Sequence, residues 1–260
     1  MTDSRRPLDE AVSIARGLAL ARHPDARAAW LGGSTASGTT TPTSDLDVTV
    51  LLDAARAGPG SVYRESLHHD GRPVELFVHV DASVRHYVAK DTWRRRPTMA
   101  RLVGEGVRLL GGGADVEALE QHCRAVLDAG PPDLDAAALE ARRYALTDQL
   151  DDLAGGGPGV EVAATAVAAW TAALELLLVV HGRWWGSGKW LAREAVALDA
   201  DLGTDHTASL HRALAEATAP GHPNARRLIG ECDDILGLVG GRRWGGYRAT
   251  GEPPAATSGG

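Results

Sequence analysis

A glycine-rich turn and two nearby aspartates are the residues of this chain that could do chemistry together. Gly32-Gly33-Ser34 follows a short apolar run, and Asp45 and Asp47 come after ten further residues. Backbone N–H groups at such a turn can approach an anion closely, because glycine has no Cβ in the way. Asp45 and Asp47 are two residues apart at the start of an extended run, so their carboxylates project to the same side.

Glu75 adds a third carboxylate, which interrupts the apolar run Val74-Glu75-Leu76. A lone carboxylate is costly to bury there unless a charge of opposite sign lies beside it. Three carboxylates next to a phosphate-binding turn suit Mg²⁺, which binds a few carboxylates together with the phosphate oxygens of a substrate. Two such ions can stabilise both the attacking and the leaving oxygen of an in-line displacement. A purely structural alternative stays open. In it the glycines form a plain turn, Asp45 is a cap, Asp47 faces solvent and Glu75 lies on an exposed edge strand.

Short strands and helices in the first half of the chain must position these residues. Hydrophobic periodicity and turn signals predict strands over 28–31, 46–52, 73–80 and 107–110, and helices over 8–21, 82–94, 98–104 and 116–127. The turn before the third of these strands is placed at Gly71-Arg72-Pro73.

The strand signal disappears after residue 130. Asp135 is predicted to cap a helix that runs to Leu153. Further helices are predicted over 160–180, 189–197, 207–218 and 224–238. We therefore predict an α+β fold in which a small mixed β-sheet with flanking helices (residues 1–130) precedes an all-helical bundle (131–245). Residues 246–260 are expected to form a disordered tail.

The composition of the chain bears on its binding partners and its cellular location. It has 27 basic and 34 acidic side chains, a formal charge of −7, which argues against nucleic acid as a partner. The apolar run over 163–180 contains Glu175, which would be costly in lipid, so we predict a buried helix and no membrane partner. Cys123 and Cys232 are too few for a disulfide framework and are expected to be reduced thiols of a cytoplasmic protein.

The turn and the carboxylates together resemble the signature of the DNA polymerase β-like nucleotidyltransferase superfamily. That signature is an apolar residue with Gly-Gly or Gly-Ser, about ten variable positions, Asp-x-Asp or Asp-x-Glu, and a later carboxylate in an apolar strand. It matches here at 31–34, 45–47 and Glu75. The resemblance implies that Asp45, Asp47 and Glu75 bind Mg²⁺, and that Gly33 and Ser34, with the neighbouring Ser44, hold the nucleotide.

The helical half resembles the kanamycin nucleotidyltransferase family over residues 148–155. In that family a glutamate of the helical domain deprotonates the substrate hydroxyl, and it aligns with Asp152. Asp148 lies one turn earlier on the same helix face and is the second candidate. Aspartate is shorter than the family's glutamate, and glycines replace the lysine that follows the family motif. A solvated helix face remains the alternative.

Lys189 follows two tryptophans and two glycines that let the backbone approach a ligand. It could neutralise nucleotide phosphates; alternatively, the tryptophans cap the bundle and Lys189 is only exposed.

The resemblance implies a nucleotidyltransferase that uses ATP or another NTP and two Mg²⁺ ions. Its acceptor would be the hydroxyl of a small molecule, such as an aminoglycoside-like antibiotic, whose positive charge suits an acidic protein. Two alternatives stay open: an antitoxin-type enzyme that modifies a protein, and an inactive nucleotide-binding module. A homodimer is compatible with each of these.

Overall fold

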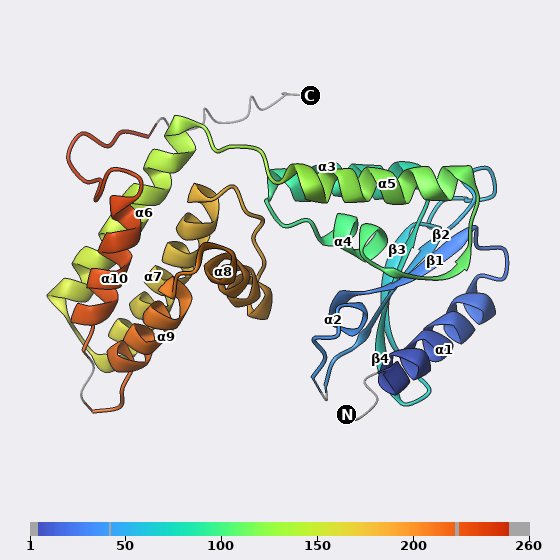
Figure 1. Cartoon of the computed structure of the whole chain (residues 1–260), viewed down its shortest axis with the longest axis horizontal. Helices are drawn as coiled ribbons and strands as arrows, with labels where there is room; N and C mark the ends of the chain where they lie inside the picture. The colour runs from blue at the N-terminus through green and yellow to red at the C-terminus, as the bar shows by residue number, and fades with distance from the viewer. Residues whose placement is uncertain (1–4, 42, 222–223, 250–260) are drawn as a thin grey trace, which may run out of the picture. The chain divides into compact units, whose positions relative to one another are not determined.

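The computed structural model of the chain describes residues 5–41, 43–221 and 224–249. The chain divides into two compact units, residues 1–131 and 132–260, and each has its own apolar core. The first unit holds a β-sheet with flanking helices, and the described part of the second is built from helices (Figure 1). The predicted α+β fold class is therefore confirmed.

A mixed five-stranded sheet forms the centre of the first unit, in the order β3-β4-β2-β1-β5. Its strands are β1 (Ala28–Gly32), β2 (Leu46–Leu51), β3 (Tyr63–His69), β4 (Arg72–His79) and β5 (Val107–Gly111). β2 and β4 run parallel, whereas the other neighbours are antiparallel. The β3–β4 hairpin produces this arrangement, because it brings β4 back beside β2.

Helices cover both faces of the sheet (Figure 1). α1 (Arg5–Arg22) covers one face, where Leu18 packs with Leu31 and Val48. On the other face a second core surrounds Trp30 and Leu119. The helices of that face are α3 (Asp81–Trp93), α4 (Thr98–Gly104) and α5 (Ala114–Ala129). Alternate strand residues enter the two cores, as the two-residue period of a strand requires.

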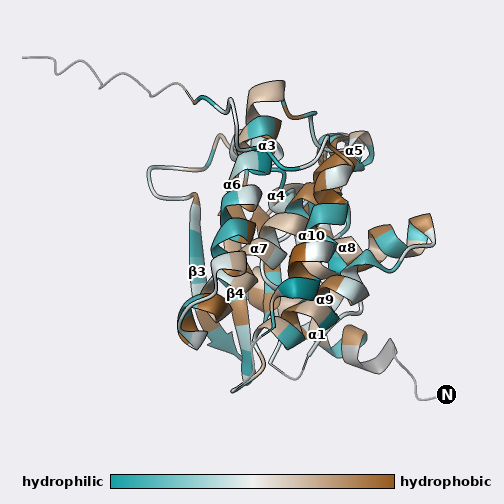
Figure 2. Ribbon diagram, turned by 90° about the vertical axis from the view of Figure 1, so that its left-hand side faces the viewer, coloured by the Kyte–Doolittle hydropathy of each residue, from teal (hydrophilic) through white to brown (hydrophobic). Residues whose placement is uncertain are grey.

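The hydrophobic pattern of the sequence does not predict β3, which is an edge strand. Its residues alternate between half-buried and exposed, and Figure 2 shows it as largely hydrophilic. The hairpin turn lies at Asp70-Gly71, where φ is 47° and 74°, and not at Gly71-Arg72-Pro73 as predicted, because Arg72 already begins β4. Two residues with positive φ are the signature of the tight turn that matches strand twist.

Five helices make up the described part of the second unit. They are α6 (Ala136–Gly155), α7 (Gly159–Val180), α8 (Lys189–Leu202), α9 (His206–Ala217) and α10 (Arg226–Gly237). α7 packs against each of the other four. The predicted cap of α6 is confirmed, since the Asp135 carboxylate accepts a 2.7 Å hydrogen bond from the Ala138 N–H.

α7 is the one helix among the described residues that is long and apolar enough to cross a membrane. In the structure one of its faces forms the centre of the helical core, as predicted for a buried helix. One of its two carboxylates, Glu175, pairs with Arg142 at 3.1 Å, and the Arg142 guanidinium lies 4.1 Å from the ring centre of Trp185. The charge that interrupts the apolar run thus has a partner inside the unit.

The segment after α10 folds back along α6. The rings of Tyr247 and Trp244 stack on Tyr144, at centroid distances of 4.2 and 5.4 Å. Of the predicted tail over 246–260, residues 246–249 belong to this segment, and residues 250–260 lie outside the described part of the chain.

Candidate functional site

The structure brings Asp45, Asp47 and Glu75 together on one face of the sheet. One carboxylate oxygen from each lies within 4.8 Å of the others, and all three residues are partly buried. Asp45 directly precedes β2, Asp47 is the second residue of β2, and Glu75 on the parallel strand β4 is its register partner. Because both strands start at this edge with the same register, their side chains meet there. We call these three residues the acidic triad.

Gly33 lies against the acidic triad. It follows β1, whose last residue, Gly32, is the register partner of Asp47, and its φ is +63°. A Cβ built on Gly33 would overlap the Asp47 carboxylate. The glycine is therefore required twice: for the left-handed backbone and for the space that the carboxylate occupies.

Buried hydroxyl residues shape the turn that follows Gly33. Ser34 and Thr35 are buried in α2 (Gly33–Ala36), a single helical turn. The Thr35 hydroxyl lies 3.3 Å from the backbone carbonyl oxygen of Asp45, and the carbonyl of Ser34 accepts a hydrogen bond from the Thr39 N–H at 2.9 Å. These contacts fix the turn to the segment that carries the first aspartate.

Ser44, expected to hold the nucleotide, is buried in the turn before Asp45. Its hydroxyl accepts a 2.8 Å hydrogen bond from the Thr41 N–H and lies 3.1 Å from the Thr41 hydroxyl. In this structure Ser44 therefore holds the turn that delivers Asp45 to the triad.

Arg64 of β3 is a charged neighbour of the triad that sequence reasoning missed. Its guanidinium forms an ion pair with Glu75. The alternation over 63–69 and the Asp70-Gly71 pair were the signals that could have found this strand. Even with the strand assigned, the contact depends on the hairpin register, which sets Ser66 opposite Glu75.

The acidic triad fits a divalent cation by its donor chemistry. Carboxylate oxygens are the ligands that Mg²⁺ takes from proteins, and the remaining positions are filled by water and phosphate oxygens. The three oxygens already lie within 4.8 Å of one another, so small side-chain rotations would place them around one ion or a close pair. The residues present therefore suit the expected metal.

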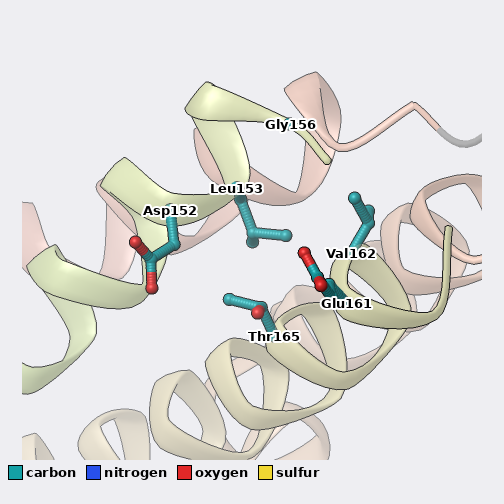
Figure 3. Close-up of a pocket in the computed structure, with 6 residues that line it drawn as sticks. All are labelled: Asp152, Leu153, Gly156, Glu161, Val162 and Thr165. Carbon is teal, nitrogen blue, oxygen red and sulfur yellow. The ribbon is translucent and has the colours of Figure 1, made fainter. Parts of the chain in front are cut away.

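The remaining predicted residues lie in the second unit. Asp148 and Asp152 are exposed on α6, and Lys189 is exposed at the start of α8. Asp152 lines a pocket of about 220 Å³ between α6 and α7 (Figure 3). The other lining residues are Leu153, Gly156, Glu161, Val162 and Thr165. Figure 3 shows the Asp152 and Glu161 carboxylates on opposite sides of Thr165, so this pocket offers acceptor groups and an apolar floor.

Part of the first unit matches a known protein family. Residues 13–94 match the family model described as a nucleotidyltransferase domain. This segment is similar to a nucleotidyltransferase domain. It includes Gly33, Ser34 and the whole acidic triad, and the similarity supports a transferase.

Curated proteins and solved structures show at most a remote similarity to the chain. No curated protein matches the chain. Among solved structures, a nucleotidyltransferase-like protein from Exiguobacterium sibiricum is similar over 88% of this chain and 73% of its own, with 11% identity and a TM-score of 0.42. A similarity this low says nothing about the substrate, and the resemblance of the second unit to the kanamycin nucleotidyltransferase family stays a prediction.

Proposed function

We propose that the chain transfers a nucleoside monophosphate, AMP from ATP, to a hydroxyl group of a small molecule and releases pyrophosphate. The observation that carries the proposal is the grouping of the acidic triad beside Gly33 within the nucleotidyltransferase domain. Phosphoryl transfer of this kind needs positioning and charge neutralisation more than covalent chemistry, and these residues can supply both.

Each residue of the proposed site has a role that its chemistry allows. Asp45, Asp47 and Glu75 would hold Mg²⁺, which when bound neutralises phosphate charge and polarises the α-phosphate. The backbone N–H groups at Gly33 and Ser34 would bind the phosphate tail.

The reaction balances without a further reactant. The acceptor oxygen forms a bond to the α-phosphorus, and the bond from that phosphorus to the bridging oxygen of the β-phosphate breaks, so pyrophosphate leaves. The proton of the acceptor hydroxyl would pass to a carboxylate, for which we propose Asp152, with Asp148 as the second candidate. For Lys189 we propose, on its charge alone, that it neutralises the leaving phosphates.

The acceptor we propose is a cationic, hydroxylated compound of the aminoglycoside type. The excess of acidic over basic side chains gives the protein a formal charge of −7, which favours association with cations. A small acceptor also accords with a second unit that offers a pocket of about 220 Å³ with two carboxylates.

The test is incubation with Mg²⁺, ATP labelled at the α-phosphate and a panel of small hydroxylated acceptors. Pyrophosphate release that requires a small acceptor supports the proposal. Label on a protein band would instead indicate a protein acceptor, and nucleotide binding without turnover would indicate an inactive module. Either result would overturn the proposed reaction.

Asp47→Asn is the sharpest variant for this assay, because it removes charge from the triad and leaves the side-chain volume nearly unchanged. We expect turnover to fall at least about 100-fold, as for loss of a group that stabilises transition-state charge. Asp25→Asn is the control, since Asp25 is 80% exposed and forms only a 3.6 Å pair with Arg56 among the described contacts. Asp152→Asn and Asp148→Asn, run in parallel, decide which of them accepts the proton.

A further inference from the structure

Arg64 places a positive charge on the acidic triad, and no step of the proposed reaction uses it. Its Nη2 pairs with Oε1 of Glu75. A guanidinium and a divalent cation compete for the same carboxylate, since each neutralises its charge and occupies its lone pairs. The position of Arg64 therefore bears directly on how the site takes up metal.

The β3–β4 hairpin holds Arg64 on the same face of the sheet as the triad. In the antiparallel register Arg64 lies opposite Phe77, and Glu75 is diagonal to it, two residues along β4. The guanidinium carbon lies 5.3 Å from the centre of the Phe77 ring, within the range of a cation–π contact. Ring and carboxylate together orient the guanidinium toward the triad.

The ion pair between Arg64 and Glu75 can break at a small cost in free energy. The Arg64 side chain is 61% exposed, whereas that of Glu75 is 24% exposed. An ion pair with one partner largely in water contributes little to stability, about 0–1 kcal/mol, because water replaces the lost contact. The guanidinium can thus leave Glu75 at small cost, and its five N–H donors then remain beside the site.

We propose that Arg64 is a counter-ion that Glu75 exchanges for the divalent cation, and that the released guanidinium then binds a phosphate oxygen of the nucleotide. The inference rests on the proposed function, because it takes the triad as the cation site. Guanidinium groups bind phosphate through paired N–H donors, so the exchange replaces one ionic contact by another.

The exchange makes metal binding depend on the nucleotide. Without nucleotide, the cation must displace Arg64 from Glu75, and the released guanidinium has no new partner. Competition with Arg64 therefore lowers the affinity of the triad for the cation. With nucleotide, the released guanidinium has a new partner, and each ligand raises the affinity for the other. In this scheme Arg64 contacts the nucleotide only after its release from Glu75.

The experiment compares Arg64→Gln with Arg22→Gln in the full chain. Mn²⁺ affinity is measured by electron paramagnetic resonance without nucleotide, and affinity for an ATP analogue that cannot be cleaved at the α-phosphate is measured with saturating Mn²⁺. Arg22 is the matched control, because it pairs with Glu65 of the same strand and both side chains are similarly exposed, at 42% and 37%. The two variants change the net charge equally.

For R64Q we expect Mn²⁺ alone to bind about 3–10-fold tighter and the analogue to bind about 3–10-fold weaker, a fold-change corresponding to about 1 kcal/mol. R22Q should change neither. Arg64→Lys keeps the charge but loses the paired donors, so it should bind Mn²⁺ like the unmodified protein and the analogue more weakly.

The possible results separate this inference from the proposed function. If the unmodified protein binds Mn²⁺ neither alone nor with the analogue, both fail. If it binds Mn²⁺ but R64Q binds it equally or more weakly, the triad stands and the exchange is refuted, since Arg64 then only orients Glu75. Equal tightening in R22Q would reduce the effect to net charge and also refute the exchange, as would an unchanged affinity of R64Q for the analogue.

Discussion

Gly33 joins two requirements that usually occur at separate residues. Its backbone has a left-handed φ, and its missing Cβ leaves the volume that the Asp47 carboxylate fills. Gly38, five residues later, has a similar φ of +69° but lies in open space, with no atom within 4 Å of a built Cβ. The two glycines thus separate the cost of a strained backbone from the cost of a collision with the triad.

Gly33→Ala is therefore expected to strain the backbone and also to displace the Asp47 carboxylate, whereas Gly38→Ala should only strain the backbone. A non-glycine residue in the left-handed region costs about 1–2 kcal/mol, which both variants share. Only G33A also displaces the Asp47 carboxylate, so Mn²⁺ binding and turnover should fall at least about 10-fold in G33A and stay near normal in G38A. Calorimetric melting and Mn²⁺ titration measure the two effects, and equal losses in both variants would remove the contact with Asp47 from the explanation.

Among the elements, β1, β5 and α5 are joined by one buried carboxylate. Glu120 of α5 is 3% exposed, and it accepts hydrogen bonds from the Trp30 indole at 2.7 Å and from Arg108 at 2.8 and 2.6 Å. Burial would raise the pKa of Glu120, but the bonds from Arg108 and Trp30 and the charges of Arg108 and Arg124 lower it. The carboxylate thus stays ionised and holds β1, which leads into Gly33, against α5.

Glu120→Gln is expected to destabilise the first unit by about 2 kcal/mol, because it leaves a hydrogen-bonded ionic donor without its charged partner. Glu117→Gln on the exposed side of the same helix should cost less than about 1 kcal/mol, the size of a charge effect in a first helical turn. Hydrogen exchange of the β1 and β5 amides reports the difference. Protection unchanged in E120Q would show that packing alone fixes these strands.

The sequence predicts those elements whose buried faces are continuous. β1, β2 and β4 are apolar runs between turn signals, and every end of these strands lies within one residue of the predicted bounds. β3 escapes prediction because it lies at the edge, and its exposed residues, Arg64, Ser66 and His68, are polar. The local signals of this strand, its alternation and the Asp70-Gly71 turn, are weaker than a continuous apolar run.

The sequence likewise predicts some residues of the candidate site and not others. Asp45, Asp47 and Glu75 can be assigned from the sequence because each lies at a marked point of a predictable strand, and the spacing of the motif links them. Arg64 cannot, since its contact with Glu75 exists only once β3 and β4 are paired in register. The role of Asp152 also remains a prediction, because it depends on what the pocket beside it binds.

The two units of the molecule rest on different interactions. The first unit has a core on each face of its sheet and includes buried polar groups such as Glu120 and His79. The second unit has a helical core, and Glu175, one of the two carboxylates of its central helix α7, pairs with Arg142. Because ionisable residues such as Glu120 and His79 are buried in the first unit, we expect acid to lower the stability of this unit.

His79 gives this acid sensitivity a defined range of pH. It is 5% exposed on β4, its Nδ1 lies 3.0 Å from the Ser83 hydroxyl, and burial lowers its pKa to about 4. In the unfolded chain a histidine takes up its proton near pH 6.5. Between these values the unfolded state binds the proton and the folded state does not, so stability is full above about pH 6.5 and falls as the pH drops toward 4.

We expect the free energy of unfolding to decrease by up to about 3 kcal/mol between pH 7 and pH 4 on account of His79. His23, whose pKa burial also lowers, adds a smaller loss in the same range. His79→Gln should therefore flatten the pH dependence without abolishing it, and His86→Gln, on the exposed face of α3, should leave it unchanged. Urea unfolding at half-unit steps of pH, followed by tryptophan fluorescence, measures the slope; a slope in H79Q as steep as in the unmodified protein would mean that His79 takes up its proton without unfolding.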